Sequence, residues 1–301
     1  MSVELEHSTI PVNGIRLHVV TAGPQDGKPI FLLHGFPEFW RGWLKQIAPL
    51  AEAGYRVIVP DQRGYNLSEV PKDIRAYSLD NLSQDIIGLF DFYGYRNVAL
   101  AGHDWGAAVA WILAIRHPDR ITRLGILNLP HPAVVRKFLS SSPKQMLKFW
   151  YFAFFQIPAL PEWLLRINQY AGAANFLRLS GKHTTFSDED IAEYKKAWAN
   201  SGGLTGMINW YRASVRYPPT IQPGVRLPMP VLILWGRRDL ALQYEMATAS
   251  LKYCPKGRLI TLDNATHWVQ HDEAQAVTQA LLEFIAEDAE PYTEENLLAQ
   301  P

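Results

Sequence analysis

The sequence predicts an α/β fold, in which a mostly parallel eight-stranded sheet is flanked by helices and interrupted by an inserted helical cap. Short apolar runs bounded by glycine and proline alternate with longer helix-like stretches, as in βαβ units. The alternation stops after residue 132 and resumes near residue 226. A chain of 301 residues is long enough for one large core with an insertion. We therefore expect a core domain made of 1–132 and 226–301, and a cap domain made of 133–225.

The expected strands follow the chain in order. The first two form a hairpin, because Asn13-Gly14 between them favours a two-residue turn. Four buried strands then alternate with helical segments, and two more follow the cap before a final helix. The cap segment is rich in aromatic residues and helix formers and has no run typical of a buried strand. The eight expected strands are 8–12, 15–20, 29–35, 55–61, 97–103, 121–130, 231–236 and 257–262.

Composition excludes several classes of partner. Lysine plus arginine equals aspartate plus glutamate, 29 each, so nothing in the total charge suggests nucleic acid or an anionic membrane. The first residues lack the basic and apolar regions of a signal peptide, and the most apolar window, 149–165, is interrupted by polar residues and prolines. We expect a cytoplasmic protein, monomer or homodimer. Cys254 is the only cysteine and is expected to be a small buried residue.

The stretch LAGHDWGAAVAW, residues 100–111, is the strongest functional signal. Its G-x-x-x-G arrangement follows a predicted strand and precedes a predicted helix, as in the elbow that exposes a nucleophile. Gly102 and Gly106 allow a tight turn, and the central residue is Asp104 instead of the usual serine. Capping of the following helix is the alternative role for Asp104.

Two further residues support the nucleophile interpretation. Asp239 and His267 each follow one of the last two strands, and ligand sites in parallel sheets form at these strand ends. The chain order nucleophile, acid, histidine matches one of the known orders of catalytic triads. The alternatives are a surface charge for Asp239 and a metal pair for His267 with His271, but cysteine ligands and an HExxH pattern are missing. Asn128 is a rival for the acid role, but an amide carries no charge to stabilise imidazolium.

The loop His34-Gly35-Phe36-Pro37 supplies the other half of the expected site. In such elbows, one oxyanion-hole amide comes from this loop and the second from the residue after the nucleophile. These are the backbone N–H groups of Phe36 and Trp105. His34 lies on the wrong strand for a base and is expected to be a buried, hydrogen-bonded structural residue.

A carboxylate nucleophile restricts the chemistry. Attack on an ester or amide would form a mixed anhydride, whereas attack on a saturated electrophilic carbon forms an alkyl ester on the enzyme. Water activated by His267 then attacks the carbonyl carbon of that ester, and the oxyanion hole stabilises the charge. The histidine and the oxyanion hole therefore serve the second step, and no metal or organic cofactor is needed.

The segments GHDWG, HGFPEFW, DQRGYNLSE, WGRRDLAL and THWVQHDEA resemble the epoxide hydrolases of the α/β-hydrolase superfamily, over residues 10 to about 285. The resemblance implies hydrolysis of hydrophobic epoxides, aromatic or aliphatic, to vicinal diols, an activity suited to detoxification. Opening an epoxide leaves a basic alkoxide, and this family meets it with two cap tyrosines. Tyr211 in GLTGMINWYR and Tyr151 in FWYFAFFQ match these positions. Phenols have a pKa near 10, so they can donate at neutral pH.

Two alternatives remain open. Haloalkane dehalogenases share the aspartate but tend to carry asparagine or glutamate where this chain has Phe36, and fluoroacetate dehalogenases resemble GHDRGAR at the elbow. A non-catalytic ligand receptor on the same fold is expected to have a damaged triad. The aromatic cap is expected to line an apolar substrate pocket. Its expected lining is Phe149 with His34, Phe36, Pro37, Trp105, Trp150, Phe154, Trp210 and Trp268.

Overall fold

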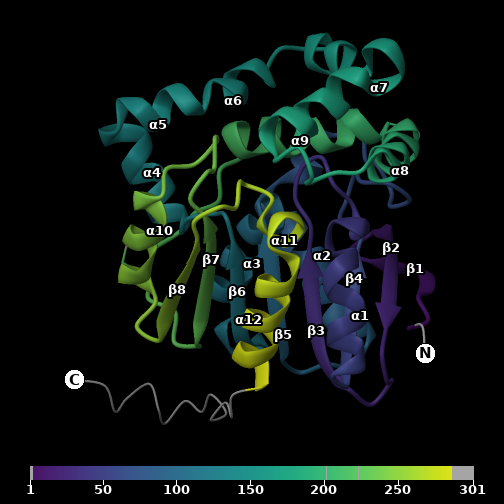
Figure 1. Cartoon of the computed structure of the whole chain (residues 1–301), viewed down its shortest axis with the longest axis vertical. Helices are drawn as coiled ribbons and strands as arrows, with labels where there is room; N and C mark the ends of the chain where they lie inside the picture. The colour runs from purple at the N-terminus through teal and green to yellow at the C-terminus, as the bar shows by residue number, and fades with distance from the viewer. Residues whose placement is uncertain (1–2, 201, 223, 287–301) are drawn as a thin grey trace.

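The sheet and its flanking helices are confirmed by the computed structural model, which describes residues 3–200, 202–222 and 224–286 (Figure 1). Eight strands form one sheet in the order β1-β2-β4-β3-β5-β6-β7-β8. The pairs β1–β2 and β2–β4 are antiparallel, and the remaining pairs are parallel. The strands are β1 (Glu6–Val12), β2 (Ile15–Ala22), β3 (Lys28–Leu33), β4 (Tyr55–Pro60), β5 (Val98–His103), β6 (Ile121–Leu127), β7 (Val231–Gly236) and β8 (Gly257–Leu262).

The predicted hairpin is confirmed. Val12 pairs with Ile15 across the turn, and both intervening residues have positive φ, 46° at Asn13 and 75° at Gly14. This conformation suits a tight hairpin because its twist matches that of the strands. The predicted strand 121–130 is too long, since β6 ends at Leu127. Asn128 has φ of 44°, in the left-handed region, and turns the chain away from the sheet.

Helices cover both faces of the sheet. On one face α1 (Leu44–Glu52) packs against α12 (Ala274–Ala286), and on the other α2 (Leu79–Phe92) packs against α3 (Trp105–Arg116). The short helices α10 (Glu245–Ser250) and α11 (Val269–Asp272) lie between β7 and α12 along the chain. Every residue of β7 is buried, as expected for an inner strand of a parallel sheet with helices on both sides.

Six helices lie between β6 and β7 along the chain, and the described part of this segment contains no strand. They lie above the carboxyl ends of the strands, at the top of Figure 1. Together we call them the cap helices; the exact division of the chain into core and cap domains stays a prediction. They are α4 (Pro132–Ser141), α5 (Pro143–Lys148), α6 (Trp150–Phe154), α7 (Leu160–Ser180), α8 (Asp188–Ala199) and α9 (Gly203–Arg216).

The helix α9 is fixed closely to the core. Trp210 donates its indole N–H to the carbonyl oxygen of Arg63 at 2.9 Å. A Cβ on Gly206 would lie 2.7 Å from the carbonyl oxygen of Gly64, so the backbones meet where only glycine fits. This contact sets the position of Tyr211, the next residue after Trp210.

Candidate active site

Asp104 stands at the sharp turn between β5 and α3. Its φ and ψ are 48° and −120°, a conformation that is strained for a residue with a side chain. Two glycines make this turn sterically possible. A Cβ on Gly102 would lie 2.5 Å from the carbonyl oxygen of Gly106, and one on Gly106 would lie 2.2 Å from that of Leu33. The alternative role of Asp104 as a helix cap is not supported, because its side chain makes no capping hydrogen bond.

The three residues singled out by chain order lie together. Nδ1 of His267 is 2.8 Å from Oδ2 of Asp239, and Nε2 of the same ring is 3.5 Å from Oδ2 of Asp104. Asp239 is in the turn after β7 and His267 is in the loop after β8. The histidine thus lies between two carboxylates, with one ring nitrogen facing each.

Asp239 is held by four hydrogen bonds. Its Oδ1 accepts from the backbone N–H groups of Ala241 and Leu242, at 2.7 and 2.9 Å. Its Oδ2 accepts from His267 and also from the side-chain amide of Asn128, at 2.6 Å. Sequence reasoning weighed Asn128 only as a rival acid; in the structure it is a donor to the acid. Asp239 is therefore oriented by the end of β6 as well as by its own loop.

Charges within the site shift its pKa values. Burial by itself lowers the pKa of His267, but the charge of Asp239 and the hydrogen bonds to Asp104 and Asp239 outweigh it and raise the pKa to about 10. Burial by itself raises the pKa of Asp104, but His267, His103 and the amide of Phe36 bring it below its ordinary value. The resting site is therefore a carboxylate facing an imidazolium.

One expected oxyanion-hole donor points at the carboxylate of Asp104. The backbone N–H of Phe36 donates to Oδ1 of Asp104 at 2.9 Å. A Cβ on Gly35 would lie 2.5 Å from Cβ of Asp104, so the loop can approach this closely only with glycine there. Trp105 is the first residue of α3, where backbone N–H groups have no acceptor within the helix. The other oxygen of Asp104, Oδ2, faces Nε2 of His267 instead of the Phe36 amide.

Tyr151 and Tyr211 both line the cavity that contains Asp104 and His267. Tyr151 lies on α6 and Tyr211 on α9, and their ring centroids are 5.9 Å apart. Trp105 contacts the Tyr211 ring edge-on at 4.9 Å. Burial, with a further contribution from the charge of Asp104, raises the pKa of both phenols well above 10. Both hydroxyls are thus protonated and able to donate over the whole neutral range.

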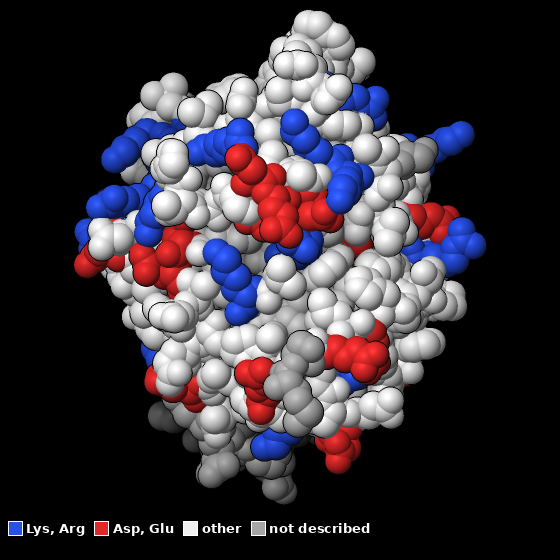
Figure 2. Space-filling view, turned by 45° about the vertical axis from the view of Figure 1, so that its right-hand side comes forward, with Lys and Arg blue, Asp and Glu red and all other residues white. Residues whose placement is uncertain are grey.

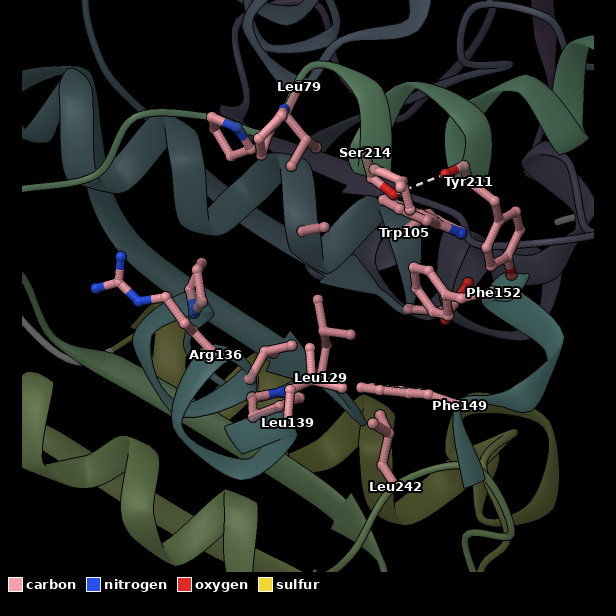
Figure 3. Close-up of a pocket in the computed structure, with 18 of the residues that line it drawn as sticks. Leu79, Trp105, Leu129, Arg136, Leu139, Phe149, Phe152, Tyr211, Ser214 and Leu242 are labelled. Carbon is pink, nitrogen blue, oxygen red and sulfur yellow. Dashed lines mark hydrogen bonds between the residues drawn. The ribbon is translucent and has the colours of Figure 1, made fainter. Parts of the chain in front are cut away.

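The cavity has a volume of about 560 Å³ and a mainly apolar wall (Figure 3). In Figure 3, Tyr211 and Trp105 lie on one side and Arg136 on the opposite side. Trp105 lines the cavity as expected, and so does Phe149, together with Phe152.

Most of the other expected lining residues are corrected by the structure. Trp150 is 65% exposed, and Phe154 packs against it. Trp210 and Trp268 are buried with their indole N–H groups donated to Arg63 and to Ser180, respectively. The residues that were expected in the lining but are not part of it are His34, Phe36, Pro37, Trp150, Phe154, Trp210 and Trp268.

The other expectation for His34, that it is a buried, hydrogen-bonded structural residue, is confirmed. Its side chain is fully buried, with Nε2 accepting from the N–H of Gln62 at 3.0 Å and Nδ1 donating to the carbonyl oxygen of Gly35 at 3.1 Å. Burial lowers its pKa, in keeping with a neutral ring. Cys254 is also buried, as expected.

Sequence reasoning missed a buried polar network beneath the elbow, centred on Glu38. Its carboxylate accepts from His271 at 2.6 Å and from the hydroxyl of Tyr194 at 2.9 Å. It also lies 3.2 Å from Nδ1 of His103, the residue before Asp104. The other nitrogen of His103 donates to the backbone carbonyl of His267 at 2.9 Å. The network thus joins the cap helix α8 to His103, the residue before Asp104, and through it to the backbone of His267.

His271 is engaged by Glu38, which does not support the metal alternative for the His267–His271 pair. Within the described ranges, no three histidine, cysteine, aspartate or glutamate side chains are grouped to hold a metal ion. None of the helices formed by the described residues is long and apolar enough to cross a bilayer.

Comparison with known proteins agrees with this geometry. The model of the family described as alpha/beta hydrolase fold matches residues 28–274. The AB hydrolase superfamily protein YfhM of Bacillus subtilis is 45% identical, over 92% of this chain and 96% of that protein. Epoxide hydrolase 2 of Caenorhabditis elegans is 36% identical, over 94% of this chain and 81% of its own. The crystal structure of Bacillus megaterium epoxide hydrolase in complex with an inhibitor superposes with a TM-score of 0.85 at 28% identity, covering 93% of this chain and all of that one. The chain therefore belongs to the alpha/beta hydrolase fold family and, within it, to the epoxide hydrolases.

Proposed function

We propose that this enzyme hydrolyses hydrophobic epoxides to vicinal diols through a covalent ester on Asp104. The observation that carries the proposal is one cavity whose wall holds a buried carboxylate, its histidine and two protonated phenols. Names of relatives such as the epoxide hydrolases of C. elegans support the same substrate class.

In the first step, Oδ2 of Asp104 attacks a ring carbon and the carbon–oxygen bond of the epoxide breaks. The leaving oxygen takes a proton from Tyr151 or Tyr211, and the other phenol donates a hydrogen bond to it. Oδ1 becomes the ester carbonyl oxygen and already accepts from Phe36. The product of this step is an alkyl ester with a free hydroxyl group on the neighbouring carbon.

The second step needs a base, and formation of the ester helps to supply one. Alkylation removes the negative charge of Asp104, which is one of the groups that raise the pKa of His267. The His267 pKa then falls, and the imidazolium gives its proton to the phenolate that the first step left. The neutral ring can then take a proton from water while Asp239 stabilises the imidazolium formed. Water attacks the carbonyl carbon, and charge collects on Oδ1 near the amides of Phe36 and Trp105. The bond between the carbonyl carbon and the ester oxygen breaks, the departing alkoxide takes the proton from His267, and the diol leaves. Asp104 then gives its remaining proton to His267, which restores the resting carboxylate and imidazolium.

Two other functions are less well supported. A haloalkane dehalogenase needs only weak donors for a halide, whereas two phenols line the same cavity as Asp104 here. A non-catalytic receptor does not need Asp104, His267 and Asp239 to lie within hydrogen-bonding distance of one another, as they do here. Parallel assays for diol and for halide release distinguish these functions, and halide release without diol would overturn the proposal.

The direct test is mass spectrometry of the His267→Gln protein after incubation with styrene oxide. We expect an adduct of one substrate molecule on the peptide that contains Asp104, because alkylation proceeds and hydrolysis stalls. The matched control is Asp104→Ala, which is expected to form no adduct and to have no turnover. Wild-type turnover in either variant would contradict the mechanism.

A further inference from the structure

The first half of α7 presents an apolar stripe to solvent. Leu160, Trp163 and Leu164 follow the spacing i, i+3, i+4, which in a globular protein normally faces the core, and Ile167 stands where the helix is interrupted, with φ and ψ of −46° and 137°. Here all four are exposed, with exposed fractions of 39%, 60%, 38% and 40%. The helix is therefore oriented with its apolar side outward.

The charged side chain of the same turn points the other way. Glu162 is buried, and its carboxylate forms a two-point ion pair with Arg212 of α9, at 2.6 and 3.1 Å. Paired guanidinium–carboxylate contacts of this kind fix orientation as well as distance. Hence α7 cannot turn its apolar stripe inward without breaking a buried ion pair.

Neighbouring helices extend this exposed surface. Leu147 at the end of α5 is 74% exposed, and Trp150 at the start of α6 is 65% exposed. In Figure 1, α5, α6 and α7 form the upper edge of the molecule, with α9 between them and the sheet. We call the exposed side chains of these three helices the cap face. Isolated exposed apolar residues are ordinary, but a contiguous group marks an interaction surface.

Charge on this part of the chain is strongly one-sided. From residue 132 to 180 there are six cations, and Glu162, already paired inward, is the only acidic residue. The six are Arg136, Lys137, Lys144, Lys148, Arg166 and Arg178. Arg178 is ion-paired with Asp188, and Lys148 donates to the backbone carbonyl oxygens of Asp239 and Leu240, so the excess positive charge rests mainly on the other four. In Figure 2 the top of the molecule is uncharged, and below it a cluster of acidic side chains lies among lysine and arginine side chains. The zero net charge of the whole chain does not reveal the excess of cations between residues 132 and 180.

We propose that the cap face docks on the surface of a membrane that contains anionic lipids. Exposed leucine and tryptophan beside lysine and arginine is the combination that binds the lipid–water interface, where indole rings and cationic side chains are both favoured. A second copy of this chain is a poorer occupant, since a two-fold contact would bring two positive surfaces together. The sequence-based expectation of no membrane partner followed from total charge and did not consider its distribution.

Docking in this orientation would also favour entry of an apolar substrate into the cavity. Leu139 on α4 and Val215 near the end of α9 line the cavity and are themselves exposed, so the cavity opens between these helices. A single residue, Ser142, separates α4 from the adjoining α5. An apolar epoxide dissolved in a bilayer would thus leave the lipid near the entrance.

The test is cosedimentation of the full-length protein with vesicles, once with phosphatidylcholine alone and once with an equal share of phosphatidylglycerol. We expect binding to the anionic vesicles, weakened by salt, and little binding to the neutral ones. Lys144→Glu with Arg166→Glu should lower the partition coefficient by more than tenfold, since each removed cation accounts for about fivefold. Leu147→Ser with Trp163→Ser should weaken binding similarly. Because these changes remove apolar contacts and no charge, the factor by which binding falls should be the same at low and high salt.

The matched control is Lys28→Glu with Phe92→Ser, which changes an exposed cation and an exposed aromatic residue at the opposite end of the sheet. It should bind like the wild type. Equal binding of wild type and both cap-face variants, or no binding of wild type, would overturn the proposal. So would a change from dimer to monomer in the cap-face variants with vesicle binding unaltered. Activity on dissolved styrene oxide, measured in parallel, reports the proposed hydrolysis independently of docking.

Discussion

Asn128 donates its side-chain amide to Oδ2 of Asp239, the same oxygen that accepts from Nδ1 of His267. Oδ1 of Asn128 accepts from the backbone N–H of Gly236 at 2.9 Å, where β7 ends. Asn128 therefore ties the ends of β6 and β7 together and holds Asp239 toward His267. Its φ of 44° is tolerated better by asparagine than by most residues.

Replacing Asn128 by glycine should slow hydrolysis of the alkyl ester more than its formation. A hydrogen bond to a charged group contributes about 1.5–3 kcal/mol, so we expect a loss of roughly 10- to 100-fold. Rapid-quench single turnovers separate the two steps. Asn128→Ala is the matched comparison, because it also loses the amide but adds strain of about 1 kcal/mol at positive φ. Unchanged hydrolysis in the glycine variant would show that Asn128 has no part in orienting Asp239.

Tyr151→Phe and Tyr211→Phe should each slow formation of the ester by about 100-fold, because each removes one donor to the leaving oxygen. The double variant should be nearly inactive. Tyr65→Phe is the control, since the Tyr65 hydroxyl is buried and has no hydrogen-bond partner among the described residues. That variant should retain its rate. If the ester forms as fast in Tyr151→Phe or Tyr211→Phe as in Tyr65→Phe, the assignment of the donors is wrong.

The pKa of His267 should depend on the charge of Asp104. Asp104→Asn imitates the neutral ester, so the His267 pKa should fall below the value of about 10 in the resting protein. Titration of the imidazole ring by NMR measures this shift. A pKa that stays near 10 in Asp104→Asn would mean that Asp239 alone sets it, and that alkylation does not generate the base.

The same raised pKa predicts how stability depends on pH. The unfolded chain has a histidine pKa near 6.5, so His267 contributes its full stabilisation below that pH and loses it as the pH rises through about 10. The free energy of unfolding of the wild type should therefore fall more steeply between pH 7 and 10 than that of His267→Gln. Parallel slopes in urea unfolding would contradict the raised pKa.

The sheet and the proximity of Asp104, Asp239 and His267 could be predicted because their signals are local or ordered along the chain. Strand runs bounded by glycine place Asp104, Asp239 and His267 at one edge of the sheet, and the structure brings them within hydrogen-bonding reach. The hairpin at Asn13-Gly14 was predicted from two residues alone. The end of β6 was missed by three residues, because nothing in the sequence showed that Asn128 takes a left-handed conformation.

Other features depend on contacts that the sequence does not reveal. Glu38 meets Tyr194 and His271 across separations of 156 and 233 residues, so no local pattern identifies the network. The prediction of the cavity lining was wrong at most positions for a different reason. The helix α6 has only five residues, too few for periodicity to show which side is buried, and Trp150 faces solvent whereas Tyr151 and Phe152 face the cavity.

The Glu38 network should make a large contribution to stability. Burial by itself raises the pKa of Glu38, but the charge of His271 and hydrogen bonds from His271 and His103 hold it far below its ordinary value. Such a carboxylate stabilises the fold above its unfolded pKa, near 4.5, and the contribution is lost as the pH falls. Glu38→Gln leaves buried histidines without their acceptor and should cost about 3 kcal/mol at pH 7.

Urea unfolding at pH 7 compares this variant with Glu69→Gln, which removes the charge of an exposed pair with Arg16. The exposed pair should contribute less than about 1 kcal/mol. Lowering the pH toward 4 should reduce the difference in free energy of unfolding between wild type and Glu38→Gln. At that pH Glu38 takes up a proton in the unfolded chain but not in the folded protein, so proton binding favours unfolding of the wild type. Equal losses for the two variants at pH 7 would mean that the buried network orients the elbow and α8 without contributing to the stability of the fold.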